Sequence, residues 1–399
     1  MESRRGTTTS TTATGPRWLA VGHRDGSDAR RAASEAVADT LAGDDAKLLV
    51  VFCTDDYDLP EVLAGVADAA GDVPVIGCST AGEISASGPG DAGIVVMALG
   101  GPGFTVATAA ARADGGHLRE ASARAARCVE EIADSPYRVL LLLTDGLAGD
   151  QQEVVRGAYQ TVGAEVPLVG GCAGDGLKMT GTFQLHGSEV LDNSVVAAAI
   201  GSDAPIGIGV RHGWRRVGEP MLVTSSDGNR VNQLDDAPAL DVYLDRLSAP
   251  PEARTDPAAF TRFALTHPLG LSRRSGEEVR FVAEADFEDR AIVCIAQLPR
   301  GAQAWIMEGD DDSVLAATDE ACGEAVAALD GRAPLGLLAF DCIARRGVLG
   351  DPGIAREVRR ISSFAGGAPV AGFYTYGEIA RTSGISGFHN QTLVVLALA

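Results

Sequence analysis

The sequence predicts an α/β protein of two domains, built from pseudo-repeated βαβ units whose mixed, mainly parallel sheets are covered by helices. Three observations support this fold class. The chain has 399 residues, more than one domain usually contains. Short, fully apolar runs alternate with segments of helical periodicity, which is typical of buried parallel strands and their crossover helices. One sequence motif also recurs along the chain.

The recurring motif defines a repeated unit. PVIGCSTAGEI at 74–84 matches PVAGFYTYGEI at 369–379 at seven of eleven positions, and PLVGGCAGDGL at 167–177 is a looser third copy. A β-branched run and a helix precede each copy, and an apolar run follows it. The unit is therefore β-α-β-α-β-β, at 17–99, 104–201 and 302–398.

The apolar runs at 48–54, 139–144 and 335–340 are predicted to be central, parallel strands that are buried on both faces. In the third unit we expect 304–307 to be the first strand and 313–329 the first helix. The region 202–301 differs, because its Gly-rich run and its Asp227–Gly228 turn favour antiparallel strands. Whether this region is a degenerate fourth copy stays open.

Composition excludes several classes of function. The net charge of −21 disfavours nucleic acid and anionic membranes as partners. Seven widely spaced cysteines without a CxxC pair suggest neither a disulfide framework nor a zinc site, and they fit a reducing cytoplasm. There is no P-loop, HExxH or GxSxG motif, and the GPGDAG run at 88–93 precedes a strand. We therefore expect no cofactor and no metal.

Several motifs together are similar to one known family. GCSTAGEI (77–84), TDG (144–146), VGGCAGDG (169–176), HPLG (267–270) and GFYTYGEIARTSGISGFHNQTLVVLAL (372–398) resemble the FIST family, F-box and intracellular signal transduction proteins. The Thr-rich composition of residues 1–16 predicts a disordered tail. The resemblance implies a FIST N-like sensory domain at 17–235 and a FIST C-like domain at 236–399. It also implies a small, amino-acid-like ligand and, since no output domain is visible, a signalling partner in trans.

Repeat-related polar residues are the candidate ligand-binding residues. Open α/β sheets bind ligands beyond the carboxyl ends of their parallel strands. An acid that follows a glycine in each copy could hold an ammonium group there, or could fix a turn. The candidates are Cys78, Thr80, Glu83, Cys172, Asp175, Arg211, Thr375, Glu378, His389 and Asn390.

The predicted function is that of a cytoplasmic sensor which binds a small metabolite and signals through a partner, without catalytic residues. Two alternatives stay open. Cys78 or Cys172 could be the nucleophile of a hydrolase, if a histidine lies within hydrogen-bond reach, and a carboxylate-dependent hydrolase is the other form of this alternative. A protein-interaction scaffold without a ligand would instead show an exposed apolar patch.

Overall fold

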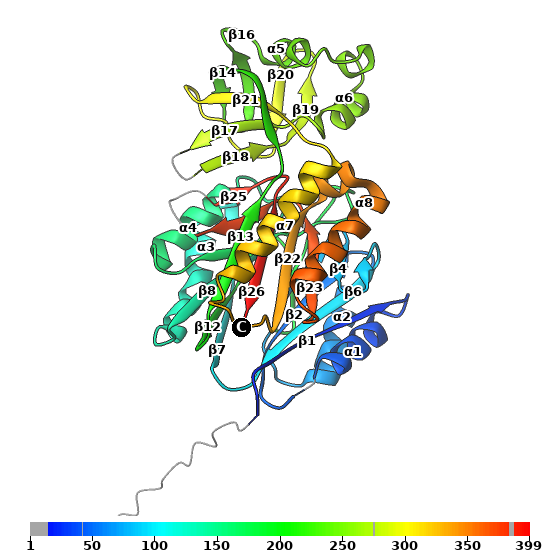
Figure 1. Ribbon diagram of the computed structural model, residues 1–399, viewed down its shortest axis with the longest axis vertical. Helices are drawn as coiled ribbons and strands as arrows, with labels where there is room; N and C mark the ends of the chain where they lie inside the picture. The colour runs from blue at the N-terminus through cyan, green and yellow to red at the C-terminus, as the bar shows by residue number, and fades with distance from the viewer. Residues whose placement is uncertain (1–14, 42, 274–275, 383–386) are drawn as a thin grey trace, which may run out of the picture.

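The computed structural model describes residues 15–41, 43–273, 276–382 and 387–399. The expected disordered tail at 1–16 lies almost entirely outside these residues. Within them the strands form four sheets, and Figure 1 shows a large body with a smaller domain at one end. No helix in the described ranges is both long enough and apolar enough to cross a membrane.

The first repeat begins with a strand and a helix whose apolar face covers the sheet. Asp58 caps its second helix through the backbone N–H of Glu61, and Pro60 stands in the first turn, as the sequence suggests. Its elements are β1 (Trp18–Asp25), α1 (Ala29–Thr40), β2 (Ala46–Thr54), α2 (Leu59–Ala70), β3 (Val75–Thr80), β4 (Glu83–Ser85), β5 (Gly88–Pro89) and β6 (Gly93–Gly100).

The second repeat follows the same order with shorter helices. Its elements are β7 (Phe104–Arg112), η1 (Asp114–Gly116), α3 (Leu118–Ala125), η2 (Ala126–Ile132), β8 (Tyr137–Thr144), α4 (Gln152–Val162), β9 (Leu168–Cys172), β10 (Gln184–His186), β11 (Glu189–Leu191) and β12 (Ser194–Ser202). Residues 173–183 separate β9 from β10, whereas only two residues separate β3 from β4.

The third repeat is interrupted after its first strand. Its elements are β13 (Ile206–Arg211), α7 (Asp311–Ala327), β22 (Gly336–Cys342), α8 (Ile343–Phe364), β23 (Val370–Thr375), β24 (Glu378–Arg381), β25 (Phe388–His389) and β26 (Leu393–Leu398). The prediction that 304–307 forms its first strand is wrong. β13 takes that place, because it pairs with β26 as β1 pairs with β6 and β7 with β12.

The interruption is a second domain, formed by residues 215–308. It contains β14 (Arg215–Asp227), β15 (Arg230–Leu234), β16 (Ala237–Pro238), α5 (Ala239–Arg246), η3 (Pro251–Arg254), α6 (Pro257–Ala264), β17 (Leu269–Arg273), β18 (Gly276–Arg280), β19 (Val282–Asp286), β20 (Ala291–Cys294) and β21 (Gln303–Glu308). Its pairings are all antiparallel, as expected. We call it the inserted domain; its strand order is not that of a fourth repeat.

The short hairpin of each repeat pairs with the sheet of a neighbouring repeat. The sheet orders are β1-β6-β2-β3-β10-β11, β25-β24-β9-β8-β12-β7 and β13-β26-β22-β23-β4-β5. The first repeat places β4 and β5 in the sheet of the third, the third places β24 and β25 in the sheet of the second, and the second places β10 and β11 in the sheet of the first. This cyclic exchange joins the three sheets into one body. The expected domain boundary at 235/236 falls inside the inserted domain, whose sheet has strands from both sides of it.

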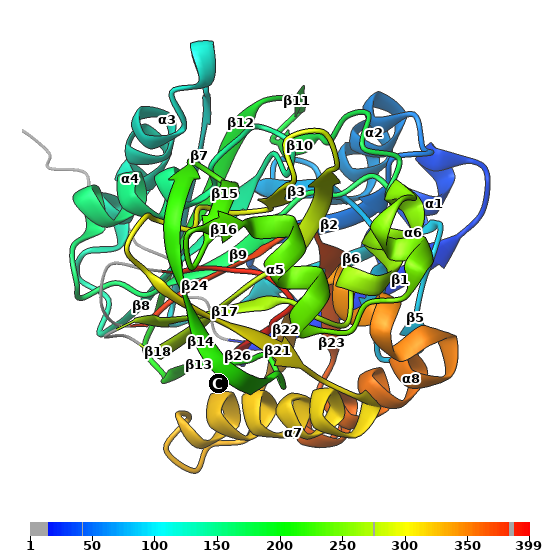
Figure 2. The ribbon, with the colours of Figure 1, turned by 90° about the horizontal axis from the view of Figure 1, so that it is seen from above.

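The expected central strands are confirmed. β2, β8 and β22 lie inside their sheets, and their central apolar residues are buried. Each is parallel to one neighbour and antiparallel to the other, so the sheets are mixed as expected but contain more antiparallel than parallel pairs. One core joins the facing sides of all three sheets, and it includes Phe52, Phe340 and Phe373. The outer sides are covered by α1 and α2, by α3 and α4, and by α7 and α8 (Figure 2).

Candidate functional site

Three loops meet where β3, β9 and β23 end, and a ring of backbone hydrogen bonds joins them. Each loop donates one N–H group to each of the other two loops, and three of these six bonds illustrate the ring. These three run from Ala81 to Tyr374 (3.1 Å), from Tyr376 to Cys172 (3.2 Å) and from Gly174 to Ser79 (3.0 Å). We call residues 79–83, 172–184 and 374–378 the crown.

The crown contains a buried threonine–glutamate pair in the first repeat. The Thr80 hydroxyl donates to Glu83 Oε1 (2.6 Å), and the Gly93 N–H donates to Glu83 Oε2 (3.1 Å). Glu83 is 1% exposed, and burial raises the pKa of its carboxyl to about 7. The pair holds the turn by which the chain leaves one sheet after β3 and enters another as β4.

The third repeat repeats this arrangement. The Thr375 hydroxyl donates to Glu378 Oε1 (2.5 Å), and the Thr392 N–H donates to Glu378 Oε2 (3.1 Å). Glu378 is fully buried, and burial raises the pKa of its carboxyl to about 8. Both candidate acids therefore accept hydrogen bonds from their own chain, and both candidate threonines are donors to them.

The expected equivalence of Asp175 with Glu83 and Glu378 is wrong. In the sheets Glu83 lies opposite Phe373, Glu378 opposite Gly171, and Gln184 opposite Cys78. Gln184 therefore takes the third place. The second repeat has a longer loop after β9, so a gap-free reading of the sequence assigned the wrong residue.

Asp175 organises that longer loop instead. Its carboxylate accepts from the N–H groups of Met179 (3.0 Å), Thr180 (2.7 Å) and Gly181 (3.1 Å), and from the Tyr376 hydroxyl. Burial alone would raise the pKa of Asp175, but these hydrogen bonds lower it. The side chains of Leu177 and Met179 are 61% and 56% exposed, and both residues have positive φ angles.

The two candidate cysteines differ in place and surroundings. Cys78 lies in the central core, whereas Cys172 lies under the outer helices and contacts the Thr144 hydroxyl (3.2 Å). Burial raises the pKa of the Cys172 thiol to about 12 and that of Cys78 well above its ordinary value. Neither sulfur contacts a histidine in the part of the chain that the structure describes, where no cluster suited to a metal ion occurs either.

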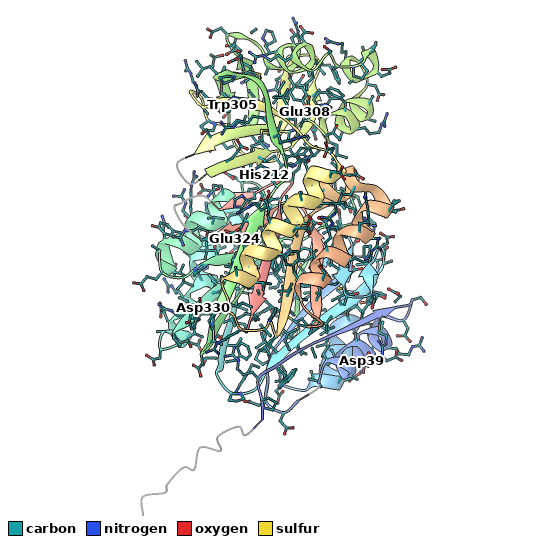
Figure 3. All side chains as sticks on the ribbon, in the orientation of Figure 1. Asp39, His212, Trp305, Glu308, Glu324 and Asp330 are labelled. Atoms are coloured by element: carbon teal, nitrogen blue, oxygen red, sulfur yellow. The ribbon has the colours of Figure 1, made fainter. Side chains whose placement is uncertain are left out.

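Arg211 stands apart from the other candidates. Its guanidinium pairs with Glu320 (3.2 Å) and Glu324 (2.7 Å) on the exposed surface of α7. Figure 3 shows Glu324 on that helix. The structure therefore does not bring Arg211 to the remaining candidate residues.

The loop at 388–392 connects the crown to the inserted domain. The Trp214 indole N–H donates to the Gln391 carbonyl (3.1 Å), and Gln391 Nε2 donates to the Leu265 carbonyl (2.8 Å). His389 contacts the Ala380 carbonyl through Nε2 (2.9 Å), and burial lowers the pKa of its imidazole. We call the contact of this loop with the inserted domain the junction.

Two carboxamides at the junction are incompletely bonded. Asn390 is 1% exposed and Gln391 is fully buried, yet Asn390 Oδ1 and Gln391 Oε1 have no hydrogen-bond partner among the described residues. Most buried polar atoms in proteins are paired, so these oxygens are exceptional. Sequence reasoning selected Asn390 but missed Gln391, although the polar run FHNQT was a visible signal for both.

A buried ion cluster lies beside the linker that enters the inserted domain. Arg345 is fully buried and donates to Asp341 (2.8 Å), to Glu357 (2.5 Å) and to the His212 carbonyl (3.0 Å). Burial and the nearby Glu357 carboxylate raise the pKa of Asp341. Figure 3 places His212 between the two bodies, and burial lowers the pKa of its imidazole to about 4. Sequence reasoning did not identify this cluster.

Comparison with known proteins gives distant relatives of unassigned role. An uncharacterized protein of Mycobacterium tuberculosis (H37Rv), Rv0628c, is 25% identical over 393 residues, covering 94% of this chain and 97% of its own. MJ1623 of Methanocaldococcus jannaschii is 27% identical over 153 residues, and the matched part is 36% of this chain and 30% of that protein. A solved cyanuric acid hydrolase matches with a TM-score of 0.38 and 11% identity over 96% of this chain and 100% of that chain.

Family models cover most of the sequence. A FIST N domain matches residues 47–237, and a FIST C domain matches residues 239–381. The border between them lies within the inserted domain, so each model takes in parts of both bodies. FIST domains are sensory domains of signal transduction. The chain belongs to the FIST family.

Proposed function

We propose that this protein is a cytoplasmic sensor that binds a small, amino-acid-like metabolite at the junction and signals to a partner protein in trans. The observation that carries the proposal is the pair of buried carboxamide oxygens, Asn390 Oδ1 and Gln391 Oε1, that lack a partner in the described chain. An unpaired buried acceptor costs about 1–3 kcal/mol, so a ligand that donates hydrogen bonds gains affinity there.

The chemistry of the junction suits an ammonium group. Gln391 Nε2 is fixed on the Leu265 carbonyl, which identifies the other atom of this carboxamide as a free acceptor. An ammonium carries three donors and no acceptor, so it complements a free carboxamide oxygen such as either of these. Because the lowered pKa values leave His212 and His389 neutral at pH 7, they do not repel such a cation.

Position also supports a sensory role. Small-molecule sites favour domain interfaces, and the junction lies between the crown and the inserted domain. The linker residue Trp214 donates a hydrogen bond to the Gln391 carbonyl of the same loop. A ligand that moved this loop would therefore also move the linker. We infer that ligand binding changes how the inserted domain is held, and that a partner protein reads this change.

The hydrolase alternative is less well supported. A nucleophilic cysteine needs a thiolate, and burial raises the pKa values of both candidate thiols. The scaffold alternative rests on one specific observation, the exposed side chains of Leu177 and Met179. The scaffold alternative predicts that no small ligand binds in the experiment below.

The test is a thermal-shift screen of the twenty amino acids and simple amines, followed by calorimetric titration of the hits. Asn390→Leu removes one free acceptor and should weaken binding by 10-fold or more, since a hydrogen bond to a charged group contributes about 1.5–3 kcal/mol. Asp192→Leu is the matched control, because this exposed residue has the equivalent place before β12. A hit bound equally by wild type and Asn390→Leu would place the ligand elsewhere, and no hit at all would favour the scaffold.

A further inference from the structure

The crown has three equivalent corners, and one of them lacks the bonds of the other two. The first and third corners are the Thr80–Glu83 and Thr375–Glu378 pairs. At the second corner, parallel pairing aligns Ala173 with the threonines, and the strand register aligns Gln184 with the glutamates. The second corner therefore has neither the hydroxyl donor nor the carboxylate.

Gln184 is left without any partner. Its side chain is fully buried, and neither Oε1 nor Nε2 has a hydrogen-bond partner among the residues that the structure describes. Its neighbour across the strands, Cys78, lies in the central core, so the carboxamide is on the inner side of the sheet. Burying a carboxamide with both ends unpaired costs free energy, so we expect a bound molecule to supply the missing hydrogen-bond partners.

The hydroxyls near this corner, among the described residues, have partners other than Gln184. Ser79 accepts from the Phe183 N–H (3.0 Å), and Thr144 contacts Gln151 (2.8 Å). Thr182 donates to the Asp145 carboxylate (2.6 Å). Ala173, where the other corners have threonine, is fully buried and has no polar side-chain atom to give.

We propose that the second corner is a separate binding site for a small neutral amide, whose donor and acceptor pair with Gln184. Both ends of the carboxamide are free, so the occupant must donate and accept on one face, as another amide does. A carboxylate does not fit this requirement, because it only accepts and would enter beside the buried carboxyls of the crown. The occupant's polar group stands where the other corners have a threonine hydroxyl.

An occupant of this corner would have to enter under the longer loop after β9. At the other two corners, a turn of two residues joins the strand that carries the threonine to the strand that carries the glutamate. At the second corner, residues 173–183 make the corresponding connection. The loop has two bulky residues, Leu177 and Met179, with positive φ angles and exposed side chains. Such conformations are strained for these residue types, and segments of this kind open more easily than the core they cover.

The experiment uses acetamide as the probe and ligand-observed NMR on the full chain as the readout. A ligand of four heavy atoms has a Kd no tighter than about 40 µM, so the titration extends into the millimolar range. Ala173→Thr supplies the missing hydroxyl and fills the site, and Gln184→Leu removes the partner. We expect each to weaken acetamide binding at least 10-fold, with Ala173→Thr also raising the midpoint of thermal unfolding. Gln233→Leu, at an exposed glutamine, should bind as wild type does.

Three outcomes would overturn the proposal. Wild type that binds no acetamide, together with an Ala173→Thr variant of higher unfolding midpoint, would mean that the corner holds water only. Acetamide binding unchanged by both variants would place the probe elsewhere. If Ala173→Thr does not fold, Ala173→Ser replaces it and should show the same loss, and unchanged binding to Ala173→Ser would overturn the proposal equally. Asn390→Leu does not touch this corner, so the two proposed sites succeed or fail independently.

Discussion

Replacing Glu378 by glutamine is expected to remove a pH dependence from the stability of the fold. Burial raises the pKa of this carboxyl from 4.5 to about 8. Between these values the folded protein binds more protons than the unfolded chain, so stability falls as the pH rises from about 4.5 to 8. A shift of this size corresponds to a loss on the order of 5 kcal/mol at pH 9.

Glutamine has the shape of the protonated acid and cannot ionise. At pH 5 the Glu378→Gln variant should be less stable than wild type by about 1–3 kcal/mol, because its single oxygen can accept from Thr375 but the Thr392 N–H then has no acceptor. At pH 9 the variant should be the more stable protein, by several kcal/mol. The free energy of unfolding of the variant minus that of wild type should therefore rise steadily from pH 5 to pH 9.

Urea unfolding followed by circular dichroism at unit steps from pH 5 to pH 9 measures this difference. Glu320→Gln is the control, since that carboxyl is two-thirds exposed (66%) and should leave the pH profile unchanged. A difference that stays constant from pH 5 to pH 9 would refute the reasoning, because it would mean that Glu378 has the same pKa in the folded and unfolded chains.

Three more changes test other parts of the structure. Phe52→Ala should cost about 3–5 kcal/mol of unfolding free energy in urea, because its ring lies 4.7 Å from that of Phe373 at the centre of all three sheets; a loss under 1 kcal/mol would contradict the shared core. Arg345→Met leaves two buried carboxyls without their cation and should cost about 3–5 kcal/mol in the same assay, and a neutral effect would argue against the cluster. Asp175→Ala should speed tryptic cleavage after Lys178 several-fold while the core stays folded, as mass spectrometry of the fragments would show; an unchanged rate would mean that other contacts hold the loop.

The repeats could be predicted because they are encoded locally. The apolar runs of the central strands are too short for helices and have no polar face, so burial between two layers was the only good solution for them. The helix starts at Asp58 and Pro60 were also visible in the sequence. These signals depend on a few neighbouring residues, which a single sequence displays completely.

Pairings between distant segments could not be predicted in the same way. β13 and β26 are almost two hundred residues apart in the chain, and the inserted domain separates them. A better-looking strand at 304–307 stood directly before the expected helix, but it pairs with β14 and β17. Periodicity indicates that a segment is a strand without indicating its neighbours.

The site was predicted in part for a related reason. The motif at 74–84 and 369–379 correctly brought Thr80, Glu83, Thr375 and Glu378 to equivalent places. Asp175 failed because a longer loop shifts the register in the second copy, and a one-residue error already moves a side chain to the other face of a strand. Gln184 was not found, since a lone glutamine has no sequence signal until its strand partner is known.

The departures from threefold repetition explain where a signal could arise. The body is closed by its exchanged hairpins, so its three sheets cannot move independently. The inserted domain is attached by two short linkers, and these lie against each other: a Cβ atom on Gly309 would come within 2.7 Å of the Trp214 ring. Trp214 in turn binds the 388–392 loop through the Gln391 carbonyl. If the proposed ligand binds this loop, it would therefore act beside the two linkers of the inserted domain, where a small displacement would reorient that domain.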